Sequence, residues 1–385
     1  MNDEFQRRMA EAARLMRGGS LMEATAAIQQ ALGVAPAAPA APTRADDDVI
    51  DVEARVVDEA ETRSGEGAEA RVAGERPARS EPTARSSRDS QAGVVDTPGA
   101  RARRARPESF TPGHFKNEAG ARDYKLFEPA RDGGPLPLVV MLHGCTQDPD
   151  DFARGTRMNA LARARGFLVL YPAQSQRANP QRCWNWFKHN HQDRGRGEPA
   201  ILAGLVREVM AAHDVDPARV YVAGLSAGGA MAAILGEAFP DLFAAVGVHS
   251  GLPVGAASDA PSAFAAMKGG ARIARRAARP GAMPPTIVFH GDADATVNVV
   301  NGEQVLEATG LARSPAVERA ATPAGVPYSR RAYLDGQGAE RGELWTLHGA
   351  GHAWSGGDPA GSYTDARGPD ASAEMLRFFL AHPKG

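Results

Sequence analysis

The feature that most constrains the fold is the stretch 221–235, in which apolar residues lead into Gly-Leu-Ser-Ala-Gly and then into small, helix-forming residues. A strand, a sharp turn and a helix in this order are typical of a nucleophile elbow, which lifts a serine hydroxyl above the edge of a sheet. We expect Gly224 and Gly228 to stand where a Cβ would collide with a neighbouring strand or helix. The pattern predicts that Ser226 is a nucleophile. The alternative is a glycine-rich turn of an ordinary α/β domain.

Apolar runs alternate with helical patterns on both sides of this stretch, and a folded domain is expected to begin near Phe110. A long helix is expected at 199–213, and a last helix passes through Met375 and Phe378. The expected strands are 123–127 (at an edge), 136–142, 167–171, 219–223, 244–249, 286–290 and 344–347. This alternation predicts an α/β fold with a mostly parallel central sheet and helices on both faces. Ligands of such sheets bind at the carboxyl ends of the strands.

The first part of the chain has a different composition. Residues 1–33 show two short amphipathic patterns separated by a glycine pair, which predicts a helical hairpin. A hairpin of this size cannot hold a core alone, so we expect it to dock on the catalytic domain, a second copy or an apolar surface such as a polymer granule. Residues 34–106 are rich in Ala, Pro, Arg and acidic residues and predict a disordered linker. The folded domain is then 107–385.

Charge and composition exclude several classes of function. The 385 residues include 44 basic and 46 acidic ones, a formal net charge of -2, which gives no reason to expect a nucleic-acid partner. No apolar run approaches the roughly 18 residues of a membrane span. The first residues are charged and lack the apolar centre of a signal peptide. Taken alone, this favours the cytoplasm.

A serine hydroxyl becomes a good nucleophile when an imidazole takes its proton and a carboxylate orients that imidazole. After an elbow of this type, the acid is expected next in the chain and the histidine last. The strand at 286–290 leads to Asp292 and Asp294. We assign the acid to Asp294, because it follows the glycine turn far enough to reach back to the site. Asp292 is expected to be a turn residue that bonds its own backbone.

The strand at 344–347 leads into a glycine-rich loop with two histidines. His352 is the expected general base, because this loop can reach over the sheet toward Ser226. His348 stands at the strand end and is expected to make a structural hydrogen bond. For His352 alone, a satisfied surface histidine is the alternative. Neither acylation of the serine nor hydrolysis of the acyl-enzyme by water at such a triad requires a metal or a cofactor.

The developing oxyanion needs two backbone N–H donors. Ala227, directly after the serine, is expected to supply one, and the turn after strand 136–142 the other. That turn reads His-Gly-Cys-Thr-Gln at 143–147, and we assign the donor to Cys145, with Thr146 as the neighbouring alternative.

The two cysteines, Cys145 and Cys183, fall in loops at the expected catalytic edge. A disulfide between them and a pair of free thiols both stay open. Three of the four tryptophans lie near the expected site and suggest a shallow apolar platform for substrate. Trp354 is the first choice for substrate contact, and Trp184 and Trp186 are further candidates; core packing is the alternative for each.

Five sequence boxes together resemble the polyhydroxybutyrate depolymerase family of esterases, over roughly residues 110–383. The boxes are His-Gly-Cys-Thr-Gln at 143–147, Cys-Trp-Asn-Trp-Phe at 183–187, Gly-Leu-Ser-Ala-Gly-Gly-Ala-Met at 224–231, His-Gly-Asp-Ala-Asp at 290–294 and Gly-His-Ala-Trp-Ser-Gly-Gly at 351–357. The resemblance implies the α/β-hydrolase fold and a triad of Ser226, Asp294 and His352. It also implies that Cys145 is an oxyanion donor. Related families include feruloyl and acetylxylan esterases.

The resemblance implies hydrolysis of ester bonds in poly- or oligo-3-hydroxybutyrate, with a feruloyl or acetylxylan-type esterase as the alternative. Many family members are exported and carry a signal peptide and a separate polymer-binding domain. This chain has an N-terminal hairpin and a linker instead, which favours a cytoplasmic protein that acts on granules or soluble oligoesters. Extracellular action is the alternative. From another class, the chain is a granule-associated binding protein whose residues 1–33 make the contact.

Overall fold

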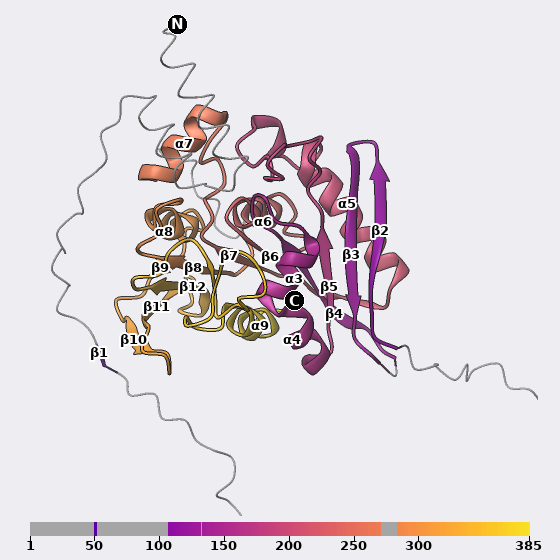
Figure 1. Ribbon diagram of the computed structural model, residues 1–385. Coiled ribbons are helices and arrows are strands. Elements are labelled where there is room, and N and C mark those ends of the chain that lie inside the picture. Colours follow the sequence, from indigo (N-terminus) through magenta and orange to yellow (C-terminus); the bar gives the residue numbers. More distant parts are fainter. Residues whose placement is uncertain (1–49, 52–106, 132, 271–282) are drawn as a thin grey trace, which may run out of the picture. The chain divides into compact units, whose positions relative to one another are not determined.

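The computed structural model describes residues 50–51, 107–131, 133–270 and 283–385. Figure 1 shows these residues as ribbons and the rest as a thin trace. The expected hairpin at 1–33 lies outside the described residues. So does the expected linker at 34–106, except for the two-residue strand β1 (Ile50–Asp51), which pairs in parallel with β10. The proposed segment boundaries therefore stay predictions.

A central sheet organises the described part of the chain. Its twelve strands follow the order β1, β10 (Glu318–Ala321), β11 (Pro327–Leu334), β12 (Glu340–Leu347), β8 (Thr286–Gly291), β7 (Ala245–His249), β6 (Val215–Leu225), β4 (Leu136–Leu142), β5 (Leu168–Pro172), β3 (Gly120–Glu128) and β2 (Ser109–Asn117), with β9 (Ala312–Arg313) paired to β11. The six strands from β12 to β5 are parallel to one another. Antiparallel strands extend this parallel centre on both sides. The expected mostly parallel sheet is confirmed.

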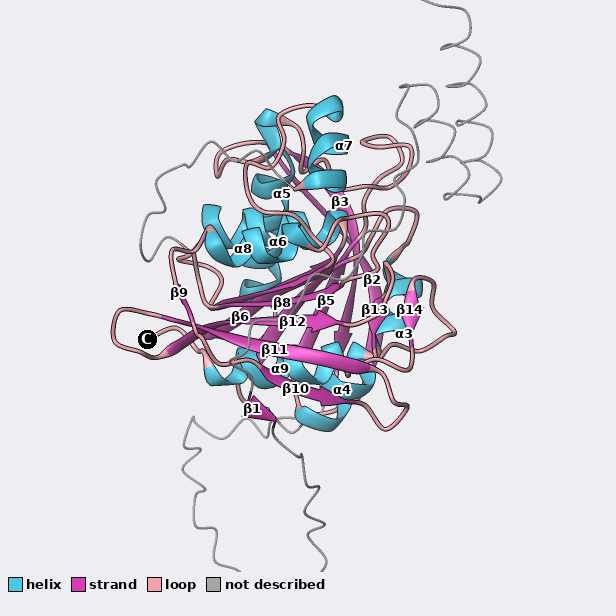
Figure 2. Cartoon of the chain, turned by 90° about the vertical axis from the view of Figure 1, so that its left-hand side faces the viewer, coloured by secondary structure: helices cyan, strands magenta, loops and turns pink. Residues whose placement is uncertain are grey.

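Helices cover both faces of the sheet, as Figure 2 shows. One face carries α5 (Gly197–Ala212), α6 (Ala227–Ala238) and α8 (Val300–Glu307), and the other carries α3 (Pro149–Thr156), α4 (Met158–Arg165) and α9 (Ala371–Ala381). The remaining elements are the short helix η1 (His189–His191), α7 (Ala260–Gly269) and the strand pair β13 (Trp354–Ser355) and β14 (Thr364–Asp365).

The apolar runs of the central strands are explained by burial on both faces. On β4, Val140 belongs to the core on the α5 and α6 side, and its neighbours Val139 and Met141 belong to the core under α3, α4 and α9. All three side chains are fully buried. Because successive side chains of a strand point to opposite faces, only a continuous apolar run fills both layers. No helix among the described residues has the length and apolar character to cross a membrane.

Two expectations about the sheet edges were wrong or incomplete. The strand expected at 123–127 is not at an edge, because β3 pairs with β2 on one side and β5 on the other. The antiparallel extension by β9, β10 and β11 was not expected. Its strands carry charged side chains such as Arg330 and Arg331, so they lack the apolar run that indicates a covered strand.

Candidate active site

The serine turn joins the end of β6 to the start of α6. Ser226 has φ 58° and ψ −119°, a conformation that non-glycine residues rarely adopt. A Cβ on Gly224 would lie 2.4 Å from the carbonyl carbon of Gly228, and one on Gly228 would lie 2.0 Å from the Leu142 oxygen. The expected reason for both glycines is thereby confirmed. The strained turn leaves Ser226 at the amino end of α6, where the helix dipole favours negative charge.

Asp294 and His352 lie side by side in loops that follow the neighbouring strands β8 and β12. Asp294 Oδ2 is 2.6 Å from His352 Nδ1. Asp294 Oδ1 accepts the N–H groups of Thr296 and Val297 at 2.9 and 2.8 Å, so the carboxylate cannot rotate away. Burial raises the pKa of Asp294, but its hydrogen bond with His352 and the bond from Val297 outweigh burial and lower it. The carboxylate is therefore ionised at neutral pH, as the orienting acid of an imidazole must be.

Asp292 makes a second contact of the same type with the first histidine of the following loop. Asp292 Oδ2 is 2.8 Å from His348 Nδ1, and its Oδ1 accepts the Gly349 N–H at 2.7 Å. His348 Nε2 is 2.7 Å from the Ser329 hydroxyl on β11. The expectation that Asp292 bonds its own backbone was wrong, because its oxygens bond the loop after β12 instead. His348 makes the structural bonds that its place at the strand end led us to expect.

His249, which sequence reasoning missed, connects the serine turn to the histidine loop. Its carbonyl accepts the Ser226 N–H at 2.8 Å, and its ring Nε2 accepts the Ser355 N–H at 3.0 Å. The remaining ring nitrogen, Nδ1, lies 3.1 Å from the Ser250 hydroxyl. Burial, followed by the charges of His290 and His352, lowers the pKa of His249 to about 3, so the ring stays neutral. Its place at the end of an apolar strand was the signal that could have found it.

No hydrogen bond among the described residues joins the Ser226 hydroxyl to the His352 ring. Contacts of this kind are often long before substrate binds. What brings the two residues to the same edge is the sheet. Leu225, directly before the serine, pairs with His249, and His249 pairs with Phe289 on β8. β8 in turn pairs with β12, the strand that leads to the histidine loop.

Of the two backbone N–H groups considered as oxyanion donors in the turn after β4, those of Cys145 and Thr146, one is unoccupied within the described part of the chain. Thr146 donates its N–H to the Gln181 carbonyl at 2.7 Å, so this donor is engaged. Among the turn, loop and cap hydrogen bonds of the described residues, none occupies the N–H of Cys145 or of Ala227. These two groups remain available to an oxyanion, which favours Cys145 over Thr146.

Cys145 and Cys183 form a disulfide, with their Cα atoms 4.2 Å apart. Of the two alternatives that the sequence left open, the structure therefore has the bridge. It ties the turn after β4 to the loop between β5 and α5.

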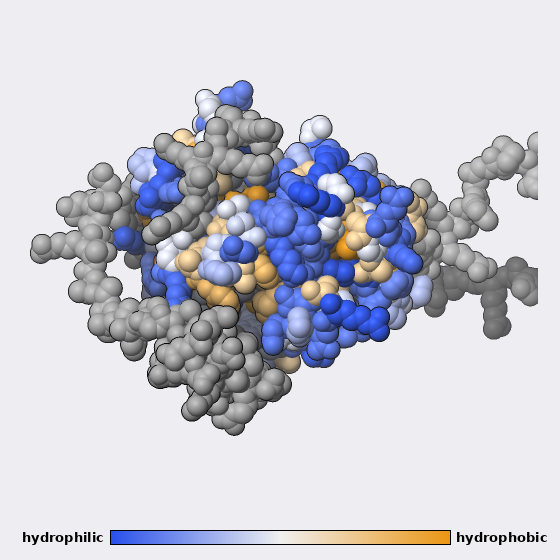
Figure 3. All heavy atoms as spheres, turned by 90° about the horizontal axis from the view of Figure 1, so that it is seen from above, coloured by the Kyte–Doolittle hydropathy of each residue, from blue (hydrophilic) through white to orange (hydrophobic). Residues whose placement is uncertain are grey.

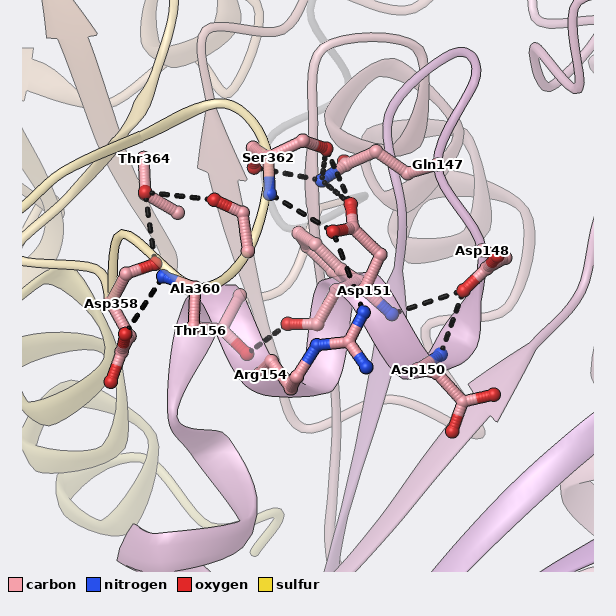
Figure 4. A network of polar contacts seen from close by, with 12 residues as sticks. Gln147, Asp148, Asp150, Asp151, Arg154, Thr156, Asp358, Ala360, Ser362 and Thr364 are labelled. Carbon is pink, nitrogen blue, oxygen red and sulfur yellow. Dashed lines mark hydrogen bonds and ion pairs between the residues drawn. The ribbon is translucent and has the colours of Figure 1, made fainter.

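A polar network around Gln147 holds the turn after β4 on the side opposite the disulfide in sequence (Figure 4). Gln147 accepts the Gly144 N–H at 2.9 Å through Oε1. Its amide nitrogen donates to Asp151 on α3 at 3.0 Å and to the Ser362 carbonyl at 3.1 Å. Ser362 returns a bond from its N–H to Asp151 at 2.9 Å. The loop around residue 362 is thereby fixed beside the turn.

Comparison with known proteins assigns the chain to a family. The family model described as "Esterase PHB depolymerase" matches residues 123–320, about half of the chain. The chain belongs to this esterase PHB depolymerase family. Poly(3-hydroxyalkanoate) depolymerase C of Paucimonas lemoignei is 33% identical over 244 residues, which cover 59% of this chain and 58% of that protein. Feruloyl esterase B of Thermothelomyces thermophilus is 33% identical over 128 residues, 33% of this chain and 43% of that protein.

Among solved structures, an acetyl xylan esterase from Aspergillus awamori has a TM-score of 0.55 at 18% identity. The alignment covers 70% of this chain and 99% of that one. This likeness confirms the expected α/β-hydrolase fold. The chain spans little more than half the length of the depolymerase relative.

The tryptophans of this PHB depolymerase family member do not form the expected exposed platform. Trp184, Trp186 and Trp354 are 0%, 5% and 1% exposed, so all three pack in the core. Trp354 stacks on the His249 ring with centroids 5.1 Å apart and donates from Nε1 to the Ser372 hydroxyl at 3.1 Å. The platform was expected because the three tryptophans lie beside the site boxes in the sequence, but their side chains pack inward, where Trp184 Nε1 donates to the His143 carbonyl at 3.1 Å.

Figure 3 shows a mostly hydrophilic face from above, with hydrophobic residues in smaller patches. The large hydrophobic side chains that the described residues expose are Phe264 on α7 and Leu380 on α9. Within the described part of the chain, no group of three or more His, Cys, Asp or Glu side chains is arranged to hold a metal ion.

Proposed function

We propose that the chain is a serine esterase that hydrolyses the ester bonds of poly- or oligo-3-hydroxyalkanoates. The observation that carries the proposal is the 2.6 Å contact between Asp294 and His352. These residues lie in loops directly after β8 and β12, two neighbouring strands of the sheet. Ser226 follows β6 of the same sheet. An ionised carboxylate beside an imidazole is the arrangement that lets the imidazole accept a proton from a serine.

The proposed reaction has two steps. The Ser226 oxygen attacks the ester carbonyl carbon while His352 Nε2 takes the hydroxyl proton, and Asp294 stabilises the imidazolium. The N–H groups of Cys145 and Ala227 bind the oxyanion. The intermediate collapses, the C–O bond of the ester breaks, and His352 returns the proton to the leaving alkoxide. Water then attacks the acyl-enzyme by the same route in reverse and releases a hydroxy acid and the free serine.

The choice of substrate rests on the relatives. The depolymerase relative shares 33% identity over more than half of this chain, which supports a polyhydroxyalkanoate. A second candidate substrate is a feruloyl or acetyl ester of plant polysaccharide, because feruloyl and acetylxylan esterases match as well. In the proposal, residues 1–33 contact the granule surface. Removal of residues 1–106 should then reduce co-sedimentation with granules and leave hydrolysis of a soluble ester unchanged. A pure binding protein would hydrolyse neither the granule polymer nor the soluble ester.

The central test is Ser226→Ala. Turnover of p-nitrophenyl butyrate should fall by roughly 10⁴-fold or more, because the residual rate without a nucleophile comes only from binding and the oxyanion donors. The circular dichroism spectrum and melting temperature should stay close to those of the parent. Retained turnover would contradict the proposal. The wild-type protein is then compared on oligomeric 3-hydroxybutyrate, methyl ferulate and acetylated xylan, and preference for either of the last two would favour the second candidate.

A further inference from the structure

We propose that Glu198, on the first turn of α5, is a positioning residue for the oxyanion turn. The proposal rests on the function proposed above. The Glu198 side chain is fully buried. Its carboxylate oxygens accept four hydrogen bonds. Arg122 on β3 donates at 2.9 Å, the N–H and side-chain amide of Asn185 donate at 2.7 Å each, and the Gln174 amide donates to the same oxygen as Arg122. One carboxylate therefore fixes both ends of the loop 174–185.

That loop holds the turn after β4 at several points. The Gln174 N–H donates to His143 Nε2 at 3.1 Å, and Trp184 Nε1 donates to the His143 carbonyl at 3.1 Å. The Gln181 carbonyl accepts the Thr146 N–H at 2.7 Å. The disulfide from Cys183 reaches Cys145 itself. The loop thus contacts the residues on both sides of the Cys145 peptide, and its own placement depends on Glu198.

The charge on Glu198 is what makes this support specific. Burial raises the pKa of Glu198, but its bonds with His191, Gln174 and Asn185 and the charge of Arg122 outweigh burial and lower it. The carboxylate stays ionised and accepts hydrogen bonds from Arg122, Gln174 and Asn185. An amide in its place would turn an NH₂ group toward groups that are themselves donors. At least one bond to the loop would be lost, and the loop would shift away from its present position.

A shift of the loop changes the reaction more than it changes substrate binding. The oxyanion donor acts on charge that develops in the transition state, and loss of one donor lowers kcat by about 10² to 10³-fold in serine hydrolases. A displaced donor should cost part of that factor. None of the hydrogen bonds of Glu198 reaches Ser226 or His352, so its effect on the reaction passes through the turn after β4.

The test compares Glu198→Gln with Glu343→Gln in the full chain. Glu343 on β12 is a matched control, because it is also fully buried and receives Arg330 at 3.0 Å, Arg377 at 2.7 Å and Trp345 Nε1 at 2.8 Å. We expect Glu198→Gln to lower kcat on p-nitrophenyl butyrate about tenfold or more with KM nearly unchanged. Its affinity for a butyl boronic acid, whose tetrahedral adduct mimics the oxyanion, should fall by a similar factor. Glu343→Gln should lower the melting temperature and leave kcat unchanged.

Gln174→Ala is the second variant, because it keeps the bonds of Glu198 with Arg122 and Asn185. It removes the bonds of the Gln174 amide group to Glu198, to the Cys183 carbonyl and from the Ser175 N–H. It should show a smaller change in the same direction. If both variants fold, lose stability as Glu343→Gln does and keep kcat and boronic acid affinity, the inference is wrong. If Ser226→Ala also keeps activity, the proposed function is wrong as well. Loss of activity in Ser226→Ala alone leaves the proposed function in place and overturns only the role of Glu198.

Discussion

Two neighbouring parts of the molecule contain an aspartate, a histidine and a serine in related arrangements. In one, Asp294 bonds His352 at 2.6 Å beside the Ser226 turn. In the other, the chain of contacts is complete, from Asp292 to His348 at 2.8 Å and from His348 to Ser329 at 2.7 Å. By hydrogen bonding alone, the second array looks more like a catalytic triad than the first. The difference lies in what surrounds each serine.

Ser226 stands at the start of a helix, beside backbone N–H groups that no turn, loop or cap bond of the described residues occupies. Ser329 lies inside β11, paired with Arg319 on one side and Thr346 on the other, so the strand backbone around it is used by the sheet. The side chains of Asp294 and His352 are 0% and 12% exposed, whereas those of Asp292 and His348 are about 38% and 37% exposed. If Ser226 is the nucleophile, as we propose, a Ser-His-Asp chain of contacts does not by itself make a serine reactive. Oxyanion donors and a desolvated acid are then also needed.

The second array still serves the first, because it joins the two loops that carry Asp294 and His352. The N–H of Asp292 donates to the Leu347 carbonyl at 3.1 Å, and that of Ala293 donates to the Ala350 carbonyl at 3.1 Å. A Cβ on Gly291 would lie 2.2 Å from the Ala350 oxygen, so only glycine allows this approach. Asp292 adds its side-chain bonds to the same junction. We therefore expect it to affect geometry and not chemistry.

Replacement of the two histidines should give the largest contrast. His352→Ala should lower kcat/KM for p-nitrophenyl butyrate by roughly 10⁴-fold or more, since the serine loses its base. His348→Ala should lower it by less than about threefold, because exposed hydrogen bonds of this type contribute only about 1 kcal/mol to stability. Steady-state kinetics on the two purified variants measures both values. Equal losses would show that the second array takes part in catalysis.

The two aspartates should differ in the same direction, with a ratio no larger than that of the two histidines. Asp294→Asn should lower kcat about 10⁴-fold, because an amide selects the wrong tautomer of the histidine. Asp292→Asn should keep most of the activity and lower the melting temperature by about 2–4 °C, the size expected for about 1 kcal/mol in a domain of this length. Kinetics and thermal unfolding of both variants check this. A severe loss of kcat in Asp292→Asn with an unchanged melting temperature would reverse the assignment.

The sequence predicted the elements of the site better than their surroundings. Ser226 and its two glycines could be found because a strained turn allows few residue types, and strand ends at 290 and 347 located the two loops. The pairing of β11 with β12, and the buried roles of Glu198 and His249, could not be found in this way. Each depends on partners far apart in the chain, such as Arg122 for Glu198 and Ser355 for His249. The tryptophans were misplaced for the same reason: they lie beside the expected site in the sequence, but their packing partners, such as His249 for Trp354, lie far away in the chain.

Ser329→Ala should have the smallest effect. The hydroxyl gives one contact to His348, and the β11 backbone keeps its pairing without it. We expect activity equal to the parent within error and a change in stability within about 0.5 kcal/mol, the range of most surface substitutions, because this half-buried hydroxyl contacts a histidine that is itself 37% exposed. A fluorophosphonate probe should label the wild type and Ser329→Ala equally and should fail to label Ser226→Ala. Labelling of Ser226→Ala at Ser329, found by mass spectrometry of the tryptic peptides, would mean that a serine without an elbow is reactive here. The contrast between the two arrays would then lie in access alone and not in the oxyanion donors.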